Sequence, residues 1–573
     1  MKKALILLLA IMMVITVVGC GGTYTDPPAP QNGGDAPNGE DSEDEPDTSV
    51  DEPMTFTIIA DEPNTLNPIL SVSSMDSEVF YLISAFLFRT YDGVTSPEVC
   101  DYFEVSEDHL TYTYYLKDAV YSDGTPITAD DFAFYIISQL DPNFGSPNAS
   151  DWINTYGIKN AREFNTGEVG RDELGVTVLD EKSFEITLEN PVATFDGMLT
   201  IMPLREDFAV EKGEALGGSA QDIEFSGPYV LKDWVYEGYL LFEKNPLFIE
   251  AENSFPVDEI EVLVGVDHNT RVAMFENGEV DVVKTINREG ANLLSEHVKN
   301  FPSGMQQAIQ FNPYGKGGNE ETGRIMANKN FRKALSYALN REAIVAAVNP
   351  LYDPTNRFIS RIFLDENESQ TFVESYPVES VPLDGDSEQA KAYLQTALEE
   401  LGYDSVSELP ELSYLTFDVQ DYIIAAETFV NQWKQVLGIE SIVINNQPVP
   451  LAIQAMMGYE YDIYYTSLSA GDDPSTILNF WITGGTVNDV VGSGRNLWSN
   501  EEYDQLLRES FLSFDLESRY ELLAQAEQIL LNEGPLEPFM AGNVTSAVQP
   551  WVEGYVYNSL DGAFSFNQLR IQK

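Results

Sequence analysis

The chain has 573 residues, is 43% hydrophobic, and carries 93 acidic against 31 basic side chains, which gives a formal net charge of −62. This length exceeds what one hydrophobic core supports and predicts two or three domains. So negative a surface repels the phosphates of nucleic acids and anionic lipid headgroups, which argues against functions based on binding them. A solubilising surface explains the acidity, although a cationic ligand or a salty environment would favour it as well.

The N-terminus has the pattern of a secretion signal. Lys2 and Lys3 precede an apolar run over residues 4–18, and its 15 residues are fewer than the roughly 20 that a membrane-spanning helix needs. The run ends at Gly19-Cys20, which resembles the lipobox of bacterial lipoproteins. That resemblance implies removal of residues 1–19 and attachment of a diacylglycerol to Cys20. The alternative is a plain signal peptide in which the cysteine is coincidental.

Residues 20–53 have the composition of a tether. The segment is rich in Pro, Gly, Asp and Glu and has almost no apolar residues. It cannot bury enough surface to offset its chain entropy, so we expect it to be disordered. With the lipid on Cys20, this predicts a protein that is anchored to the membrane and does not span it.

From residue 54 onward, strand and helix patterns mix without strict alternation. Apolar residues recur every second position over 54–58, 184–188 and 260–264, which predicts half-buried strands. They recur with helical spacing over 331–339, over 390–398 and from about 516 to 531, where Gly402 and Gly534 are expected to end the last two helices. Thr128–Asp131 and Ser499–Glu502 resemble capping boxes at helix starts. These patterns predict a large α/β protein with mixed sheets.

Catalytic and metal-binding patterns are absent from the sequence. The three histidines, His109, His268 and His297, stand apart from one another, and the two cysteines, Cys20 and Cys100, are too few for a cysteine metal site. No nucleophile elbow or phosphate-binding loop occurs. A secreted hydrolase that works with two carboxylates is the enzyme alternative, but no pair stands out in so acidic a chain. We therefore expect no metal, no cofactor and no catalysis.

Eight segments, in order, resemble the oligopeptide/dipeptide/nickel-binding family of ABC-transporter solute receptors. They are Glu62–Pro68, Tyr121–Phe132, Phe225–Leu231 with Trp234 and Lys244–Pro246, Glu276–Asp281, Phe311–Asn312 with Phe331–Arg341, Gly458–Leu478, Asn496–Asp504, and Pro535–Pro538. One such segment alone is weak, but eight in the right order over residues 54–573 are specific. The Asp123-Gly124-Thr125-Pro126 part also has the composition of a turn, because Gly allows positive φ and Asp bonds the backbone ahead of it.

The resemblance implies a fold of two α/β lobes joined by two crossing segments, of the periplasmic-binding-protein type. It implies the following division: lobe one at 54–85, 195–305 and 540–573, an inserted domain at 86–194, and lobe two at 306–539. The hinges are expected near 308–312 and 540–544. The mechanism implied is closure of the lobes around an extended peptide, whose backbone is held by edge strands of the protein.

The same resemblance implies the ligand-binding residues. One edge strand is expected at Val72-Ser73-Ser74 and another at Tyr465-Thr466-Ser467-Leu468. Many relatives pair an aspartate before the Asp-Pro turn with the peptide's α-ammonium, but alignment on Pro474 puts Ala470 at that position. Asp472 is the nearest replacement, while Asp473 is expected to cap the helix that begins near Ser475. The rival interpretation is a ligand without a free α-amino group.

The implied partners are a peptide-like solute and a permease pair with its ATPases, with the receptor itself a monomer on the outer face of the cell membrane. Fold does not fix the ligand. A metal complex, a sugar or an opine-like solute therefore stays open, as does a role as a peptide sensor.

Overall fold

The predicted hydrophobic periods form strands. Phe56 and Ile58 are buried in β1 (Thr55–Ile59), and Phe184 and Ile186 are buried in β7 (Ser183–Thr187). The computed structural model describes residues 54–91, 94–154, 156–193, 195, 201–250, 255–471, 473–485, 487–490, 495–559 and 563–572. Residues 1–53, with the predicted signal, lipidation site and tether, lie outside the described residues. Residues 55–573 form one compact unit.

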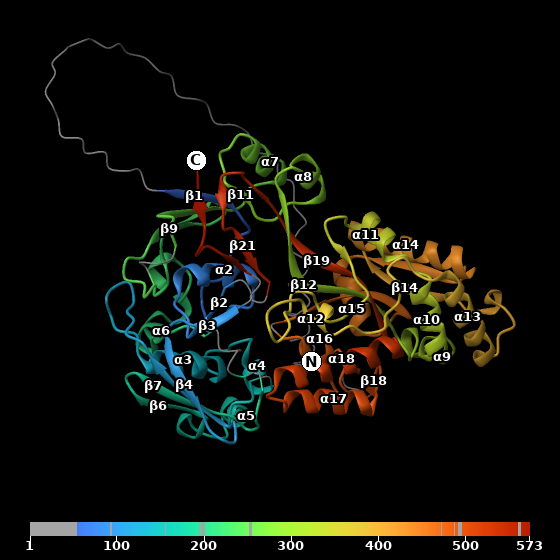
Figure 1. Ribbon diagram of the computed structural model, residues 1–573, viewed down its shortest axis with the longest axis horizontal. Helices are drawn as coiled ribbons and strands as arrows, with labels where there is room; N and C mark the ends of the chain where they lie inside the picture. The colour runs from blue at the N-terminus through green and yellow to red at the C-terminus, as the bar shows by residue number, and fades with distance from the viewer. Residues whose placement is uncertain are drawn as a thin grey trace, which may run out of the picture. The chain divides into compact units, whose positions relative to one another are not determined.

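The main sheet has eleven strands in the order β15-β14-β16-β12-β19-β11-β1-β10-β9-β8, with β13 paired to β19. Its other strands are β8 (Tyr229–Val235), β9 (Tyr239–Lys244), β10 (Glu259–Leu263), β11 (Val282–Val283), β12 (Val298–Phe311), β13 (Asp353–Pro354), β14 (Leu412–Phe417), β15 (Ile442–Gln447), β16 (Ile463–Ser469) and β19 (Leu536–Val548). The long strands β12 and β19 run side by side in the centre of Figure 1, between the elements around β1 and those around β14. They are the two segments that cross between the two sides of the sheet.

A second, four-stranded sheet has the order β4-β5-β7-β6 and is antiparallel. Its other strands are β4 (Cys100–Val105), β5 (Thr111–Leu116) and β6 (Val176–Asp180). The remaining pairs are β2 (Phe88–Tyr91) with β3 (Val94–Pro97), β17 (Asp489–Val490) with β18 (Arg495–Asn496), β20 (Val552–Glu553) with β23 (Arg570–Ile571), and β21 (Val556–Asn558) with β22 (Ala563–Ser565).

Helices cover the sheets. They are α2 (Ser74–Ile83), α3 (Ala129–Leu140), α4 (Ala149–Asn154), α5 (Ala161–Thr166), α6 (Glu206–Lys212), α7 (His268–Glu276), α8 (Arg288–Leu293), α9 (Glu320–Ala327), α10 (Lys329–Tyr337), α11 (Arg341–Val348), α12 (Phe372–Ser375), α13 (Ser387–Leu401), α14 (Gln420–Leu437), α15 (Val449–Met457), α16 (Ser475–Asn479), α17 (Glu501–Phe511) and α18 (Leu516–Glu533). None of those in the described residues is long and apolar enough to cross a bilayer.

The helix ends follow their capping chemistry, with one correction. Gly402 and Gly534 end α13 and α18 in the left-handed conformation, at φ of 79° and 57°, as predicted. The predicted capping box at Ser499–Glu502 is wrong by one residue. Asn500 is the N-cap of α17, because its side-chain oxygen accepts the N–H of Tyr503 at 3.0 Å. An Asn and a Ser side by side are both good caps, so composition alone does not choose between them.

The Tyr121–Phe132 segment is a turn followed by a capped helix, as predicted. Asp123 accepts the N–H of Thr125 at 2.8 Å, and Gly124 has a φ of 86°. The carboxylate of Asp131 accepts the N–H of Thr128 at 2.8 Å, where α3 begins. These contacts stabilise the turn and the start of the helix.

Buried apolar residues form separate clusters on the two sides of the crossing strands. One large cluster joins residues of β1, β7 and the C-terminal strands, so the four-stranded sheet shares a core with the β1 side of the main sheet. Two further clusters lie on opposite faces of β12 and β16: Ile309 and Tyr465 belong to one, and Ala308 and Leu468 to the other. Because successive residues of a strand point to opposite faces, both strands are packed on both faces.

Candidate functional site

The ladder between β12 and β19 is interrupted where the strands cross. Pro302 pairs with Asn543 and Gln306 pairs with Ala541, so β12 has two more residues than β19 at this point. Gly304, inside this bulge, has a φ of 72°. A Cβ there would lie 2.8 Å from Cδ1 of Ile362, the end of a flexible side chain that can move, so the positive φ is the feature that favours glycine. This break lies opposite one predicted hinge, 540–544. A second register shift occurs between Gln307, which pairs with Met540, and Ala308, which pairs with Pro538, at the start of the other predicted hinge, 308–312.

Strand β16 has one free edge. Along one side it pairs with β12 over its whole length, from Ile463 opposite Phe311 to Ser469 opposite Met305. Along the other side it pairs with β14 only at Ile463 and Tyr464. In the described part of the chain, no strand pairs with residues 465–469 on that side. The predicted site segment Tyr465–Leu468 therefore presents the unpaired N–H and C=O groups that a ligand strand needs.

Side chains hold this edge strand rigidly. Tyr465 stacks on Tyr422 with ring centroids 4.2 Å apart and meets Phe539 edge-on at 5.2 Å. Tyr465, Thr466 and Leu468 are all buried. Because these side chains are already packed, binding of a ligand strand here would cost little conformational entropy of the protein.

Buried polar groups without partners lie beside the free edge. Ser467 Oγ, Gln306 Oε1 and Gln307 Oε1 have no hydrogen-bond partner within the described residues. Gln307 is the direct cross-strand neighbour of Ser467, and Gln306 of Leu468. Buried polar atoms are nearly always bonded, and exceptions mark functional positions or bound water. The two glutamines were not predicted from the sequence, because β12 holds other polar residues as well and its composition does not single them out.

The turn after β16 is anchored to the crossing. The N–H of Ala470 donates to the carbonyl of Gly304 at 2.9 Å, and the Ala470 side chain is buried. Asp473 Oδ1 accepts the N–H of Ser475 at 2.8 Å, as predicted, and also an N–H of Arg519 at 2.6 Å. Asp473 is thus occupied by its own protein. The predicted anchor, Asp472, lies outside the described residues.

The expected edge strand at Val72–Ser74 is wrong as secondary structure. Ser74 is the first residue of α2, and the hydroxyl of Ser73 accepts the N–H of Met75 at 3.2 Å to cap that helix. The resemblance fixed the position of this segment but not its conformation, which depends on the Ser73 hydroxyl bonding the backbone of the next turn. Ser73 itself has extended backbone, with φ of −110° and ψ of 139°. No hydrogen bond of the described residues joins this segment to β16.

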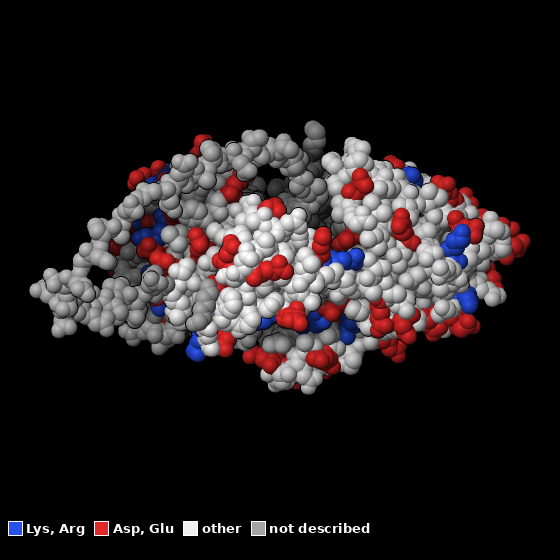
Figure 2. All heavy atoms as spheres, turned by 90° about the horizontal axis from the view of Figure 1, so that it is seen from above, with Lys and Arg blue, Asp and Glu red and all other residues white. Residues whose placement is uncertain are grey.

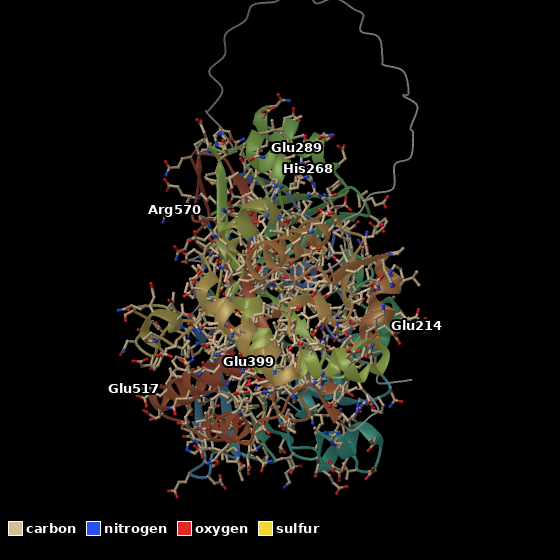
Figure 3. All side chains as sticks on the ribbon, turned by 90° about the vertical axis from the view of Figure 1, so that its right-hand side faces the viewer. Glu214, His268, Glu289, Glu399, Glu517 and Arg570 are labelled. Carbon is tan, nitrogen blue, oxygen red and sulfur yellow. The ribbon has the colours of Figure 1, made fainter. Side chains whose placement is uncertain are left out.

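Acidic side chains are spread over the described part of the face shown in Figure 2, with few Lys or Arg between them. In Figure 3, Glu214, Glu289, Glu399 and Glu517 stand at exposed positions on different elements. Among the described residues, no group of three or more His, Cys, Asp or Glu side chains is placed to hold a metal ion. Cys100 is a free, buried thiol, and burial raises its pKa to about 11.

Comparisons with known proteins identify the family. Residues 95–489 match the bacterial extracellular solute-binding proteins, family 5 (middle part). The chain is 28% identical to the oligopeptide-binding protein OppA of Bacillus subtilis, over 93% of this chain and 92% of that one. Its structure is similar to a periplasmic oligopeptide-binding protein of Borrelia burgdorferi, with 26% identity, a TM-score of 0.65, and coverage of 88% and 97%.

A second solved structure shares the fold. The unliganded open form of MppA, a murein tripeptide binding protein, has a TM-score of 0.75 at 22% identity, over 91% of this chain and 98% of that one. The two-lobe fold and the resemblance inferred from the eight sequence motifs are thereby confirmed. The chain belongs to family 5 of the bacterial extracellular solute-binding proteins, so it is a solute receptor and not an enzyme.

Proposed function

We propose that this protein captures oligopeptides outside the cell and delivers them to an ABC importer without altering them. The observation that carries the proposal is the free edge of β16 at residues 465–469, with the unpartnered Ser467 and Gln307 beside it. Peptide backbone adds to such an edge through main-chain hydrogen bonds that are independent of side chains. The same ligand class is supported by two similar proteins: the oligopeptide-binding protein of Bacillus subtilis, and Listeria monocytogenes OppA, whose structure was solved bound to peptide.

The mechanism is closure of the two lobes about the crossing of β12 and β19. The bulge at 302–306 places irregular backbone, including Gly304, where a hinge must absorb changes in φ and ψ. Lobe one is assigned to 54–85, 195–305 and 540–573 with an inserted domain at 86–194, and lobe two to 306–539. Val72, Ser73 and Ser74 contact the peptide from lobe one through their backbone.

The peptide's α-ammonium needs a carboxylate, because a buried ammonium without one costs several kcal/mol. Ala470 cannot supply it, and Asp473 is held by Ser475 and Arg519. Asp472 is the nearest remaining carboxylate in the sequence. We assign it the anchoring role in the proposed site.

Lipid attachment at Cys20 would keep the receptor, a monomer, at the outer face of the cell membrane beside its permease pair and ATPases. The apolar run that ends at Gly19-Cys20 supports this assignment. Labelled palmitate should enter the wild-type chain but not Cys20→Ser, and the variant should be shed into the medium. Equal membrane retention of the two proteins would refute the anchor.

Calorimetry with matched peptides tests the ligand class. An unmodified pentapeptide should bind, while the same peptide with N-methylated backbone amides should lose about 1 kcal/mol or more for each hydrogen bond removed. Equal affinity for both would refute backbone recognition at the β16 edge. Binding of a sugar, metal complex or opine-like solute, with no response to peptides, would show a different solute on the same fold.

A further inference from the structure

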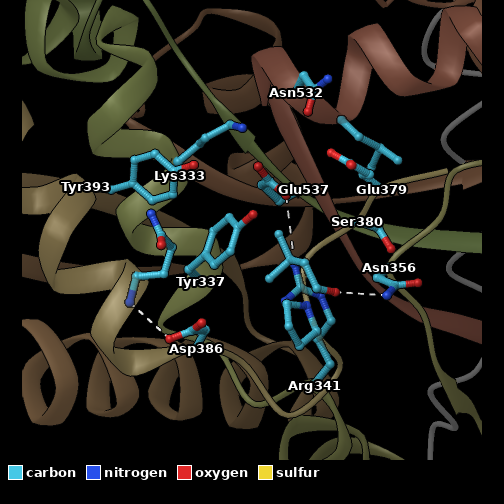
Figure 4. Close-up of a pocket in the computed structure, with 14 residues that line it drawn as sticks. Lys333, Tyr337, Arg341, Asn356, Glu379, Ser380, Asp386, Tyr393, Asn532 and Glu537 are labelled. Atoms are coloured by element: carbon cyan, nitrogen blue, oxygen red, sulfur yellow. Dashed lines mark hydrogen bonds and ion pairs between the residues drawn. The ribbon is translucent and has the colours of Figure 1, made fainter.

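A second cavity lies away from the β16 edge. It has a volume of about 520 Å³ and is enclosed by α10, α13, residues 379–382, the end of α18 and the start of β19. Figure 4 shows Lys333, Tyr337, Glu379, Asn532 and Glu537 among the residues that line it. None of the residues proposed to contact the transported peptide lines it. Its size falls within the range of small-molecule sites.

Two cations line this cavity: Arg341, which lies 3.8 Å from Glu537, and Lys333, which contacts no carboxylate of the described residues. The Lys333 ammonium lies 5.6 Å from the centre of the Tyr393 ring. Among the described residues, no hydrogen bond or ion pair engages this ammonium, although the chain has three acidic groups for every basic one. Partial burial lowers the pKa of Lys333. The ammonium is thus partly desolvated and not compensated by an anion in contact with it.

Glu537 and Glu379 provide negative charge in this cavity, together with Asp386, whose carboxylate caps α13. Glu537 is buried, and its Oε2 accepts the hydroxyl of Ser336 at 2.7 Å and lies 3.8 Å from the guanidinium of Arg341. No hydrogen bond within the described residues reaches its Oε1. Burial raises the pKa of Glu537 in spite of Arg341. Glu379 is exposed at the rim, and its side chain has no ion pair among the described residues.

Lys333 thus shares one cavity with Glu537 and Glu379. The charge of Lys333 interacts electrostatically with Glu537 and with Glu379. Among the described residues, however, neither carboxylate forms an ion pair with the Lys333 ammonium. A phosphate or other dianion would be repelled by the two glutamates. A simple cation would leave Lys333 uncompensated, and an apolar molecule would leave every charge unsatisfied. A small molecule with one positive and one negative end can pair its anionic end with Lys333 and its cationic end with the glutamates.

We propose that this cavity binds a free α-amino acid. The α-carboxylate is held by Lys333, with the hydroxyl of Ser380 and the amide of Asn532 as further donors on the cavity wall. The α-ammonium is held by Glu537 and Glu379. Bound here, the amino acid contacts β19 at Glu537, four residues before Ala541, where the crossing bulge begins. The site is separate from the proposed peptide site and does not depend on it.

The test uses the purified full chain and three probes measured by calorimetry and thermal unfolding. L-alanine should bind and raise the unfolding temperature. L-alaninamide, which lacks the carboxylate, and N-acetyl-L-alanine, which lacks the ammonium, should each bind at least about tenfold more weakly. Because this comparison uses the wild-type protein, it does not depend on any variant folding.

Two variants locate the site. Lys333→Met should weaken L-alanine binding at least about tenfold, and Glu379→Gln, at the exposed rim, should weaken it by a smaller factor. Lys391→Met, which removes an exposed lysine of α13 outside the cavity, should leave L-alanine binding unchanged. No binding of L-alanine up to about 10 mM, equal binding of all three probes, or unchanged affinity in Lys333→Met would each overturn the proposal.

Discussion

Gln307 and Ser467 face each other across the β12–β16 ladder, and each has a buried side-chain oxygen without a hydrogen-bond partner in the described residues. Leaving a buried polar group unbonded costs about 1–3 kcal/mol. The pair lies next to the stretch of β16 that no other strand of the described residues covers. Side-chain and backbone groups that lack hydrogen-bond partners thus lie together at β16, and this is the basis for proposing that the peptide binds at this edge.

Proline substitutions at Thr466 and Ser467 should have opposite consequences. Successive residues of a strand direct their N–H groups to opposite edges, so one of these two amides faces β12 and the other faces the free edge. Proline at the first kind of position breaks the ladder and lowers the unfolding temperature. Proline at the second kind leaves the fold intact and weakens peptide binding. Thermal unfolding measures the stability of both variants, and calorimetry measures their peptide affinity. Normal peptide binding by both folded variants would contradict the placement of the peptide at the free edge of β16.

Acetylation of a peptide's N-terminus should weaken its binding markedly, because the α-ammonium loses its charge. Asp472→Asn should cause a similar loss. If Asp472 holds the ammonium, both changes together should weaken binding little more than either alone. Calorimetry on one peptide with free and acetylated termini measures this coupling. Indifference of the wild type to acetylation would instead indicate a blocked or non-peptide ligand.

The ion pair between Asp473 and Arg519 should contribute strongly to stability. The charged atoms are 2.6 Å apart, and the Arg519 side chain is only 3% exposed. Asp473→Asn leaves that guanidinium buried without its carboxylate and should lower the free energy of unfolding by about 3 kcal/mol. Glu521→Gln, at an exposed position of the same helix, should change it by less than about 0.5 kcal/mol. Denaturant titration that found equal effects would contradict the structural role of Asp473.

Glu224 should make stability depend on pH. Burial raises its pKa from 4.5 to about 7, even though Arg205 lies 3.1 Å away. Between these two values the folded state binds more protons at Glu224 than the unfolded state does, so this group's contribution to stability falls as pH rises. Glu224→Gln removes the titration. The stability of the wild type relative to this variant should therefore decrease from pH 4.5 to 7, and a pH-independent difference would show that Glu224 is solvated.

Local patterns predicted the fold because they act over a few residues. The strand period at Phe56 and Ile58, the left-handed glycines 402 and 534, and the Asp123 turn all depend on neighbours in sequence. The family resemblance supplied the β16 segment. Its free edge could not be derived from the sequence, because that edge depends on β14 diverging after Tyr464.

The failures have the same origin. Ser73 is a helix cap, and the sequence does not reveal whether a serine hydroxyl will bond the next turn of backbone. The cavity at Lys333 joins α10, α13 and β19, which are far apart in the chain. Only tertiary packing brings Lys333 and Glu537 to one space.

The proposed backbone recognition at the β16 edge predicts that this receptor binds peptides of many sequences and releases them unchanged. The most direct measurement is to incubate the full-length protein with a pool of peptides of mixed sequence, remove the unbound fraction, and identify the bound molecules by mass spectrometry. We predict intact peptides with varied side chains, and their depletion when the peptides carry N-methylated amides. Recovery of hydrolysed peptides, or of no peptides at all, would contradict the proposed function.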